Sequence, residues 1–569
     1  MSTLSSELKD LEELTSNAKQ IQDDVLEEIL KVNANTEYLR RFLHGSFDKE
    51  LFQKNVPVVS YEDVKPYLER VANGEPSNVI SGEPITNFLL SSGTTGGTQK
   101  IFPVNNKFFE KVVFIDALRA SIISKHINGV KQGKVMMFIS TRPSSSTRSG
   151  LPVDPLMTSF VRSSYFKNWS SKRFTSPDEV ILCVDNKQSM YCHLLCGLVQ
   201  REEVVSMAAT FASSLVQAIT FLETHWKELC DNIRSGHVSE WITDISCKES
   251  VSAILGGSNL ELADLIEQEC IKKSWEGIIT RLWPNIKSIQ GVVTGQMSQY
   301  IPILEFYSNK LPLISPYYAS SETIFGVNVN PLCKPQDVSY TFMPNMSYFE
   351  FITIDGGNNG EIVDLVNVKI GCSYEVLVTN HFGLYRYRMG DILQVTGFYN
   401  SAPQFRFVRR KNVVLSVQME ATTEEDLLKA LNHASLVLES AGLMLMGFTC
   451  SSDISTLPGH YVLYWEIKAN NANSIVKLDD KVMVECCCVV EKSLDILYRS
   501  FRSKYGSIGA LEVRVVQQGT FDSLMEYCIS KGASASQYKT PICINSPEVL
   551  AILDDKVHAR FFSDRLPPL

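Results

Sequence analysis

The ten residues Ser91–Lys100 constrain this chain most, because they place three glycines, five hydroxyl side chains and a lysine directly after the apolar run Phe88–Leu90. Glycines allow neighbouring backbone N–H groups to point into one concavity, where hydroxyls and a lysine add donors and positive charge. The pattern predicts a strand followed by a polyphosphate-binding loop. It is not a Walker A loop, because Thr98 stands where Gly-Lys would be required. A flexible glycine turn is the alternative.

Two further segments become informative when they are considered together with that loop. Tyr318 and Glu322 lie four residues apart after an apolar run, and Asp391 follows Gly390 at the end of another. An aromatic ring can stack on adenine, a carboxylate can ligate Mg²⁺, and a second carboxylate can accept the ribose hydroxyls. Alone, each segment would be an ordinary loop, but together with the first loop they predict an ATP site.

Alternating short β-branched runs and helical stretches over residues 86–400 predict an α/β body with partly parallel sheets. An amphipathic helix is expected from Leu11 to Ile29, and a buried helix from Val204 to Cys230. The expected strands are Val180–Val184, Ser288–Thr294, Leu313–Tyr317, Tyr348–Ile354 and Tyr374–Thr379. We place an N-terminal domain at residues 1–416, a polar hinge at 417–426 and a compact α+β domain at 427–569.

The charge balance argues against some partners. The formal net charge is −9, which opposes nonspecific attraction to nucleic acid. The polar, charged start lacks the basic-then-apolar order of a secretory signal, so we expect a cytoplasmic protein. We also expect the protein to be a monomer. The uncharged run Val204–Leu222 contains six Ser, Thr or Gln residues and predicts a buried helix rather than a membrane span. The 14 cysteines form no CxxC pair, which favours free thiols over metal ligands.

The three motifs resemble those of the adenylate-forming superfamily and, within it, the plant Gretchen Hagen acyl acid amido synthetases. The likeness extends over essentially the whole chain and is greatest for the benzoate-type branch of that family. Further segments that resemble the family, in family order, are 192–197, 281–285, 293–297, 339–351 and 405–410.

The resemblance implies a large N-terminal adenylate-forming domain with mixed sheets flanked by helices, and a smaller mobile C-terminal domain. It assigns ATP phosphates to the loop, the adenine ring to Tyr318, Mg²⁺ and a catalytic role to Glu322, and ribose to Asp391. Lys539 would reach the reacting carboxylate and α-phosphate, and Arg119 would contact the acyl substrate. Without the resemblance, Lys539 would be a solvated lysine and Arg119 part of a surface salt bridge. The cofactor-binding set is Ser91, Ser92, Gly93, Thr94, Thr95, Tyr318, Ser321, Glu322 and Asp391.

The implied reaction uses ATP and Mg²⁺ to adenylate a small carboxylic acid and then passes the acyl group to an amino acid. Benzoates, chorismate-like acids, auxins and jasmonate-like acids are candidate substrates; Arg119 favours the first two, and glutamate is the favoured amino acid. An acyl-CoA ligase, or a paralogue that binds nucleotide and acid with weak turnover, is the alternative. Ala319, Ile542 and Ala421 depart from the family's glycine, arginine and lysine, and the last two remove positive charge.

Overall fold

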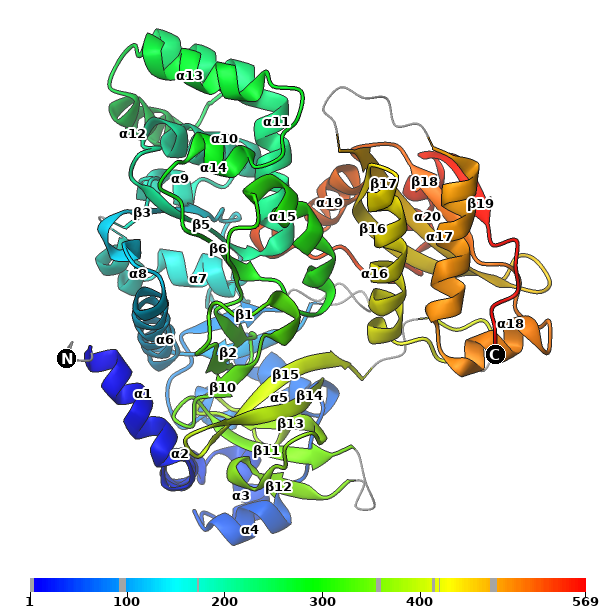
Figure 1. The fold of residues 1–569 in the computed structure, drawn as a ribbon. Helices are drawn as coiled ribbons and strands as arrows, with labels where there is room; N and C mark the ends of the chain where they lie inside the picture. The colour runs from blue at the N-terminus through cyan, green and yellow to red at the C-terminus, as the bar shows by residue number, and fades with distance from the viewer. Residues whose placement is uncertain are drawn as a thin grey trace.

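The computed structural model describes residues 5–91, 99–170, 173–354, 360–411, 415–418, 420–470 and 478–569, and the statements below refer to these residues. They form four sheets with helices packed around them. Three sheets lie before residue 411 and the fourth follows it. Figure 1 shows the last part, coloured olive to red, beside the rest of the molecule, with the helices α16 and α19 on the facing side. The expected mixed α/β architecture is confirmed.

A four-stranded parallel sheet in the order β3-β5-β6-β7 forms the centre of the largest core. Its central strands are buried on both faces, which accounts for their nearly continuous apolar sequences. Helices α10 and α11 pack against it, and α15 contributes to the same core. The strands are β3 (Lys134–Phe138), β5 (Val204–Phe211), β6 (Ser288–Val292) and β7 (Leu313–Ile314).

An eight-stranded antiparallel sheet has the order β12-β11-β13-β14-β15-β10-β9-β8. Its strands are β8 (Tyr317–Ala319), β9 (Ile324–Val327), β10 (Tyr340–Phe342), β11 (Tyr348–Thr353), β12 (Ile362–Asp364), β13 (Ser373–Thr379), β14 (Tyr387–Tyr399) and β15 (Ala402–Arg410). A smaller sheet, β2-β1-β4, contains β1 (Asn87–Leu90), β2 (Ile101–Val104) and β4 (Val153–Pro155). Strand β1 pairs antiparallel with β2 and parallel with β4.

Fifteen α-helices are described in the part of the chain before residue 411. They are α1 (Ser6–Ser16), α2 (Ala18–Asn33), α3 (Glu37–Leu43), α4 (Lys49–Asn55), α5 (Tyr61–Ala72), α6 (Asn106–His126), α7 (Leu156–Arg162), α8 (Ser164–Ser170), α9 (Asp178–Leu182), α10 (Asn186–Val199), α11 (Ala212–Ser235), α12 (Ile245–Leu255), α13 (Leu260–Cys270), α14 (Ile278–Leu282) and α15 (Ile301–Ser308). The 3-10 helix η3 (Gly295–Tyr300) precedes α15.

The C-terminal part is built on the sheet β16-β17-β18-β19, in which β17 and β18 are parallel. Its strands and helices are β16 (Leu443–Asp453), β17 (His460–Ala469), β18 (Glu512–Val516), β19 (Val557–Phe562), α16 (Glu424–Ser440), α17 (Asp480–Ser493), α18 (Ile496–Ser503), α19 (Thr520–Ser530) and α20 (Pro547–Asp554). Helix α16 begins at a capping box in which Thr423 and Asp426 bond each other's backbone N–H groups. Its apolar face joins α17 and the sheet in a separate core.

Four expected elements differ in the structure. The strand expected at Leu313–Tyr317 is divided between β7, which ends at Ile314, and β8, which starts at Tyr317 in another sheet. Residues 180–182 belong to helix α9, since Pro177 and two acids form a helix start that outweighs the β-branched residues. Residues 204–211 are strand β5, and the helix begins only at Ala212; an apolar run buried on all sides has no periodicity to separate strand from helix. The N-terminal helix is interrupted at Asn17, whose side chain bonds the carbonyl of Glu13. No helix in the described ranges is long and apolar enough to cross a membrane.

The connection between the two parts is attached at both ends. The N–H of Lys411 donates to the carbonyl of Gly390 (2.8 Å), and the N–H of Leu415 donates to the carbonyl of Thr422 (3.2 Å). The carboxylate of Glu420 accepts the N–H of Val417 (2.5 Å) and the hydroxyl of Tyr461 on β17 (3.0 Å). Much of the expected hinge is therefore bonded to the C-terminal sheet. We infer that a rotating unit would start at Leu415.

Polar contacts join the two parts across their interface. The ammonium of Lys468 on β17 bonds the carboxylate of Glu223 on α11 and the hydroxyl of Tyr307 on α15 (3.1 Å). Lys187 pairs with Glu526 at 2.8 Å, and Arg142 donates to the carbonyl of Gly532 at 3.1 Å. The structure therefore represents a specific arrangement of the two parts.

Candidate active site

The ends of β1 and β8 meet at the first predicted motif. Ser321, just after β8, donates its hydroxyl to the carbonyl of Leu90, the last residue of β1 (3.2 Å). The hydroxyl of Ser91 accepts the N–H of Lys100 at 3.0 Å, and the N–H of Ser91 donates to the carbonyl of Lys100 at 2.9 Å. These bonds hold the two ends of the glycine loop together. The predicted Ser92, Gly93, Thr94 and Thr95 lie outside the described residues.

Tyr318 and Asp391 are brought into contact, although 73 positions separate them. The Tyr318 hydroxyl donates to Oδ2 of Asp391, and the Tyr318 ring stacks on Phe325 with centroids 4.3 Å apart. Burial and the neighbouring carboxylate raise the pKa of Tyr318 well above its usual value. The Asp391 side chain is buried, and Gly390 before it has φ +75°, a conformation that favours glycine. The predicted adenine and ribose residues thus share one site.

Arg410 belongs to the same site but is absent from the sequence-predicted set. It is the cross-strand partner of Asp391 in the pairing of β14 with β15, and its Nε lies 3.3 Å from Oδ1 of Asp391. An opposite-charge pair in register stabilises adjacent strands, and Arg410 adds positive charge beside Asp391, the residue predicted to bind ribose. Arg410 could be identified as a site residue only from the antiparallel register of β14 and β15, which the sequence alone does not determine.

Glu322 lies in the short connection between β8 and β9, where Asn380 donates its side-chain amide to the Glu322 carbonyl at 2.9 Å. Burial raises the pKa of the Glu322 carboxyl, and hydrogen bonding to Ser320 and the positive charge of Arg410 only partly oppose this. A half-buried carboxylate whose ionised form is disfavoured gains from a hard divalent cation nearby. The chemistry of Glu322 therefore fits the predicted Mg²⁺.

Lys539 comes from the C-terminal part but faces the N-terminal part. Its Nζ lies 4.3 Å from the ring centroid of Phe211, at the end of β5. Burial and Arg410 lower the pKa of Lys539 to about 8, while Asp391 and Glu424 oppose this shift. Lys539 is therefore half-buried at the interface between the two parts. Gln296 on η3 holds the same segment by donating its side-chain amide to the carbonyl of Thr540.

Arg119 is buried on α6 rather than placed in a surface salt bridge. Its Nε donates to Oδ1 of Asp116 at 2.8 Å, and its Nη1 donates to the side-chain carbonyl of Gln290 on β6. Arg173 pairs with the other oxygen of Asp116 at 2.7 Å. The charge of Arg119 also acts on Tyr317, the neighbour of Tyr318. Two guanidinium groups thus share one carboxylate near the nucleotide motif, and contact between Arg119 and an acyl substrate stays a prediction.

The three departures from the family pattern have different surroundings. The side chain of Ile542 is buried in the C-terminal core, three residues beyond Lys539. Ala421 is exposed, and Ala319 is half-buried on β8. An arginine at position 542 would have to leave that core to act at the site. In this arrangement of the two parts, the side chain at position 542 therefore does not decide the charge beside Lys539.

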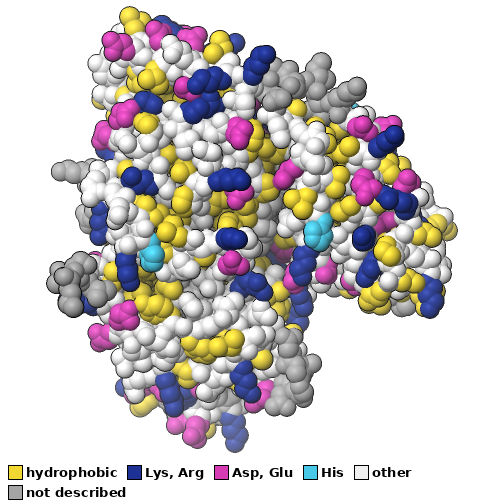
Figure 2. Space-filling model, viewed as in Figure 1, with side chains coloured by type: hydrophobic (Ala, Val, Ile, Leu, Met, Phe, Trp, Pro, Cys, Tyr) yellow, Lys and Arg dark blue, Asp and Glu magenta, His cyan; other side chains and the backbone are white. Residues whose placement is uncertain are grey.

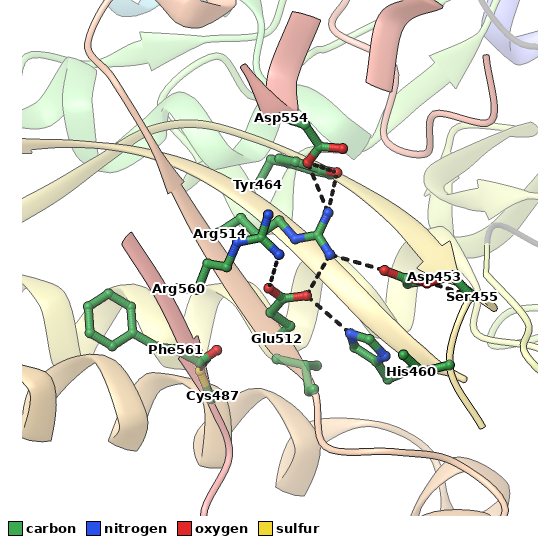
Figure 3. Close-up of polar contacts among 12 residues, drawn as sticks. Asp453, Ser455, His460, Tyr464, Cys487, Glu512, Arg514, Asp554, Arg560 and Phe561 are labelled. Atoms are coloured by element: carbon green, nitrogen blue, oxygen red, sulfur yellow. Dashed lines mark hydrogen bonds and ion pairs between the residues drawn. The ribbon is translucent and has the colours of Figure 1, made fainter. Parts of the chain in front are cut away.

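A second polar cluster in the C-terminal part contains metal-ligand residue types but is already neutralised. Asp453, His460 and Glu512 lie close enough to share an ion. As Figure 3 shows, the Arg514 guanidinium occupies that position, 3.1 Å from Asp453 and 2.8 Å from Glu512. Burial opposes ionisation of Glu512, but bonds from His460 and Arg514 prevail and lower its pKa to about 2. The cluster is an ion-pair network.

All 14 cysteines are free thiols.

Basic and acidic side chains are interspersed over the face drawn in Figure 2. Among the described residues on that face, Lys and Arg do not gather into a broad basic surface of the kind that a nucleic-acid backbone requires. This agrees with the net charge of −9.

Comparisons with known proteins cover nearly the whole chain. Models of the GH3 family N-terminal, central and C-terminal domains match residues 7–313, 340–410 and 425–548. The chain is 58% identical over 562 residues to the 4-substituted benzoates-glutamate ligase GH3.12 of Arabidopsis thaliana, with 98% of each chain covered. It is 51% identical over 587 residues to the indole-3-acetic acid-amido synthetase GH3.17 of the same species, with 98% of this chain and 96% of the relative covered.

Two solved structures define the fold relationship. The AtGH3.15 acyl acid amido synthetase in complex with 2,4-DB superposes with a TM-score of 0.93 at 50% identity, covering 99% of this chain and 98% of that one. The 2-hydroxyisobutyryl-CoA ligase in its postadenylation state superposes with a TM-score of 0.51 at 12% identity, covering 94% of this chain and 91% of that one. The second likeness shows a shared fold and nothing finer.

Proposed function

Because this chain belongs to the GH3 family, we propose that it is an ATP-dependent acyl acid amido synthetase that joins a small aromatic carboxylic acid to an amino acid. The observation that carries the proposal is the bonded pair Tyr318 and Asp391, flanked by Arg410 and approached by Lys539. Residues distant in sequence thus provide an aromatic face, an acid for ribose and positive charge for phosphate in one site.

The first step would activate the acid. A free carboxylate is a poor acyl donor, because its leaving group would be an oxide. A carboxylate oxygen would attack the α-phosphorus of ATP, and pyrophosphate would leave as the acyl adenylate forms. Lys539 and the loop that starts at Ser91 would stabilise the developing charge. Mg²⁺ held by Glu322 would add charge neutralisation on the phosphates.

The second step would form the amide. The amine of an amino acid would attack the acyl carbon, AMP would leave, and the amine would release a proton. The protein supplies orientation and charge stabilisation in both steps, and a protein nucleophile is unnecessary. Lys539 cannot easily serve from one position both the attack on the α-phosphorus and the attack of the amine on the acyl carbon. We therefore propose that the C-terminal part rotates between the steps.

For the substrates we propose a benzoate-type acid and glutamate. The support is the 58% identity to a 4-substituted benzoates-glutamate ligase, together with a buried arginine, Arg119, whose charge acts on Tyr317, the residue before Tyr318. A guanidinium can hold a second acidic group of such a substrate by paired hydrogen bonds. The auxin indole-3-acetic acid is the second candidate, because a 51% identical relative is an indole-3-acetic acid-amido synthetase.

A crossed screen tests the proposal directly. The purified chain is incubated with ATP, Mg²⁺, one acid from the benzoate or auxin series and each of the twenty amino acids, and the products are read by mass spectrometry. A benzoyl-glutamate product is expected. A thioester formed only with coenzyme A would indicate an acyl-CoA ligase, and the lack of acid-dependent exchange of pyrophosphate into ATP would indicate a binding protein.

We also propose that the protein acts in the cytoplasm as a monomer. The support is the set of 14 free cysteines, which suits a reducing compartment. Light scattering of the purified chain tests the monomer, and imaging of a fluorescent fusion tests the compartment.

A further inference from the structure

Two cysteines lie opposite each other beside the segment that carries Lys539. Cys450 is on β16, and Cys543 follows Lys539 by four residues. The N–H of Cys450 donates to the carbonyl of Ile542 (2.8 Å), and the N–H of Ile544 donates to the carbonyl of Cys450 (2.8 Å). This is the bonding pattern of a parallel bridge, in which Cys450 and Cys543 are direct partners.

The backbone spacing at such a pair suits a disulfide. Adjacent strands lie about 4.8 Å apart, and disulfides join Cα atoms that are ~4.4–6.8 Å apart. Side chains of directly paired residues leave the sheet on the same side, so both sulfurs project together. The neighbouring Cys450 lowers the pKa of Cys543, while the Cys450 thiol donates to the carbonyl of Ile542 (2.9 Å) and the Cys543 thiol to Oδ1 of Asn545 (3.7 Å). The pair can be bridged with little movement of the backbone.

Access distinguishes this pair from other cysteines that lie close together. Cys450 is fully buried, whereas Cys543 is partly exposed. Cys183 and Cys247 also interact, but both are buried, so a dissolved oxidant cannot reach either of them. A reactive pair needs one accessible thiol to begin the exchange.

We propose that Cys450 and Cys543 form a reversible disulfide when the protein meets a low-molecular-weight disulfide such as oxidised glutathione. The Cys543 thiolate attacks one sulfur of the oxidant and releases one glutathione thiolate. The Cys450 thiol then loses its proton and attacks the Cys543 sulfur, releasing the second glutathione. The two protein thiols are oxidised by two electrons, and oxidised glutathione is reduced by two.

The disulfide would act on the segment that carries Lys539. Thr449, beside Cys450, already donates its hydroxyl to the carbonyl of Pro541 at 2.7 Å, and Gln296 bonds the carbonyl of Thr540 across the interface. A covalent bond between the two sulfurs would tie the segment around Cys543 to β16 and restrict the small adjustments by which Lys539 is positioned. Since a displacement near 1 Å can cost a large factor in rate, we expect oxidation to slow adenylation about tenfold. This consequence rests on the proposed function, whereas the disulfide itself does not.

The test uses the full chain in glutathione buffers of graded oxidation. Thiols are then blocked, the protein is digested with trypsin without reductant, and peptides are read by mass spectrometry. Cleavage gives the peptides 430–468 and 540–556, each with a single cysteine, so their linkage is unambiguous. Pyrophosphate exchange is measured on the same samples before and after dithiothreitol. The variants are Cys450→Ser, Cys543→Ser and, as a matched control, the partly exposed Cys528→Ser.

The linked peptide should form in the wild type and in Cys528→Ser, and exchange activity should fall with it and return on reduction. Cys450→Ser should stop at a glutathione adduct on Cys543. If the wild type also stops at that adduct, or links other cysteines instead, the proposed disulfide is wrong. A linked peptide without a change in activity would overturn the effect on Lys539. If neither redox form exchanges pyrophosphate, the proposed function fails while the peptide result still decides the disulfide.

Discussion

The phenol of Tyr318 donates a hydrogen bond to Oδ2 of Asp391, joining the residue that we expect to stack on adenine to the residue that we expect to bind ribose. The second oxygen of Asp391 lies 3.3 Å from Nε of Arg410 and accepts no hydrogen bond within the described chain. Tyr318 therefore orients the Asp391 carboxylate, and its Oδ1 is buried beside Arg410 without a hydrogen-bond donor among the described residues.

Replacing Tyr318 with phenylalanine should weaken ATP binding while preserving ring stacking. The variant leaves Asp391 without its phenol donor, and one hydrogen bond is worth ~0.5–1.5 kcal/mol, so KM for ATP should rise about threefold to tenfold. Pyrophosphate exchange at varied ATP measures this, with Asp391→Asn as the more severe comparison. An unchanged KM for ATP in both variants would place the ribose elsewhere.

Replacing Lys539 with alanine should separate the two half-reactions. Loss of one charge that stabilises the transition state costs on the order of 100-fold, and we expect that loss in pyrophosphate exchange. Aminolysis of chemically prepared acyl adenylate should decrease much less, because in the rotation that we propose Lys539 has left the reacting atoms by then. Equal losses in both assays would contradict this division of roles.

The pH dependence of adenylation should report the lowered pKa of Lys539. That pKa is about 8, so kcat/KM for exchange should fall as the pH rises through 8 and the ammonium loses its charge. Lys539→Arg, which stays charged, should extend the plateau to higher pH even if its overall rate is lower. The unfolded chain retains this proton up to about pH 10. Between pH 8 and about 10 the unfolded chain therefore binds more protons than the folded chain, and the free energy of unfolding rises with pH as the cost of burying the charged lysine is relieved. Circular dichroism at each pH separates loss of activity from unfolding.

Replacing Lys468 with methionine should shift the balance between arrangements of the two parts. The change removes the bonds from Lys468 to Glu223 and Tyr307 across the interface. A partly buried pair of this kind contributes on the order of 1 kcal/mol, so adenylation should slow about fivefold. Aminolysis of preformed adenylate should be unchanged or faster. Lys481→Met, at an exposed lysine of α17, is the control and should change neither rate.

The network around Glu512 should stabilise the C-terminal part above mildly acidic pH. The pKa of Glu512 is lowered to about 2, so its contribution is complete above its ordinary pKa and is lost as the pH falls from there towards 2. Breaking a buried ion pair costs about 3 kcal/mol or more, so Arg514→Met should lower the free energy of unfolding by that amount at pH 7. Denaturant titrations measure it. Glu485→Gln, which breaks the exposed pair with Arg565, should cost under ~1 kcal/mol.

The site could be predicted from sequence wherever one short segment carries the chemistry. Tyr318 and Asp391 were expected to act together, and the structure bonds them. Arg410 and Glu424 could not be found this way. The first enters through the register of β14 with β15, and the second through the packing of α16 against the N-terminal part. Register and packing between parts are properties of the whole fold.

The secondary-structure elements that were predicted wrongly have a similar origin. Strand β5 and helix α11 are adjacent apolar segments, buried where they meet, so hydrophobic periodicity marks no boundary at Ala212. In contrast, α16 has a capping box and an apolar stripe, two local signals that mark the start of a helix and its exposed face. Local signals identify an element when one of its faces contacts water, and fail when all of its faces are buried.

The short attachment between Lys411 and Leu415 limits how the molecule can work. Only three residues, 412–414, separate two anchored backbone positions, and four steps of extended chain reach at most about 14 Å. The rotation that we propose for the C-terminal part would therefore be a swivel about this point. The local concentration of Lys539 at the catalytic centre would stay high throughout a turnover cycle, and the timing of the half-reactions would depend on angle rather than on diffusion.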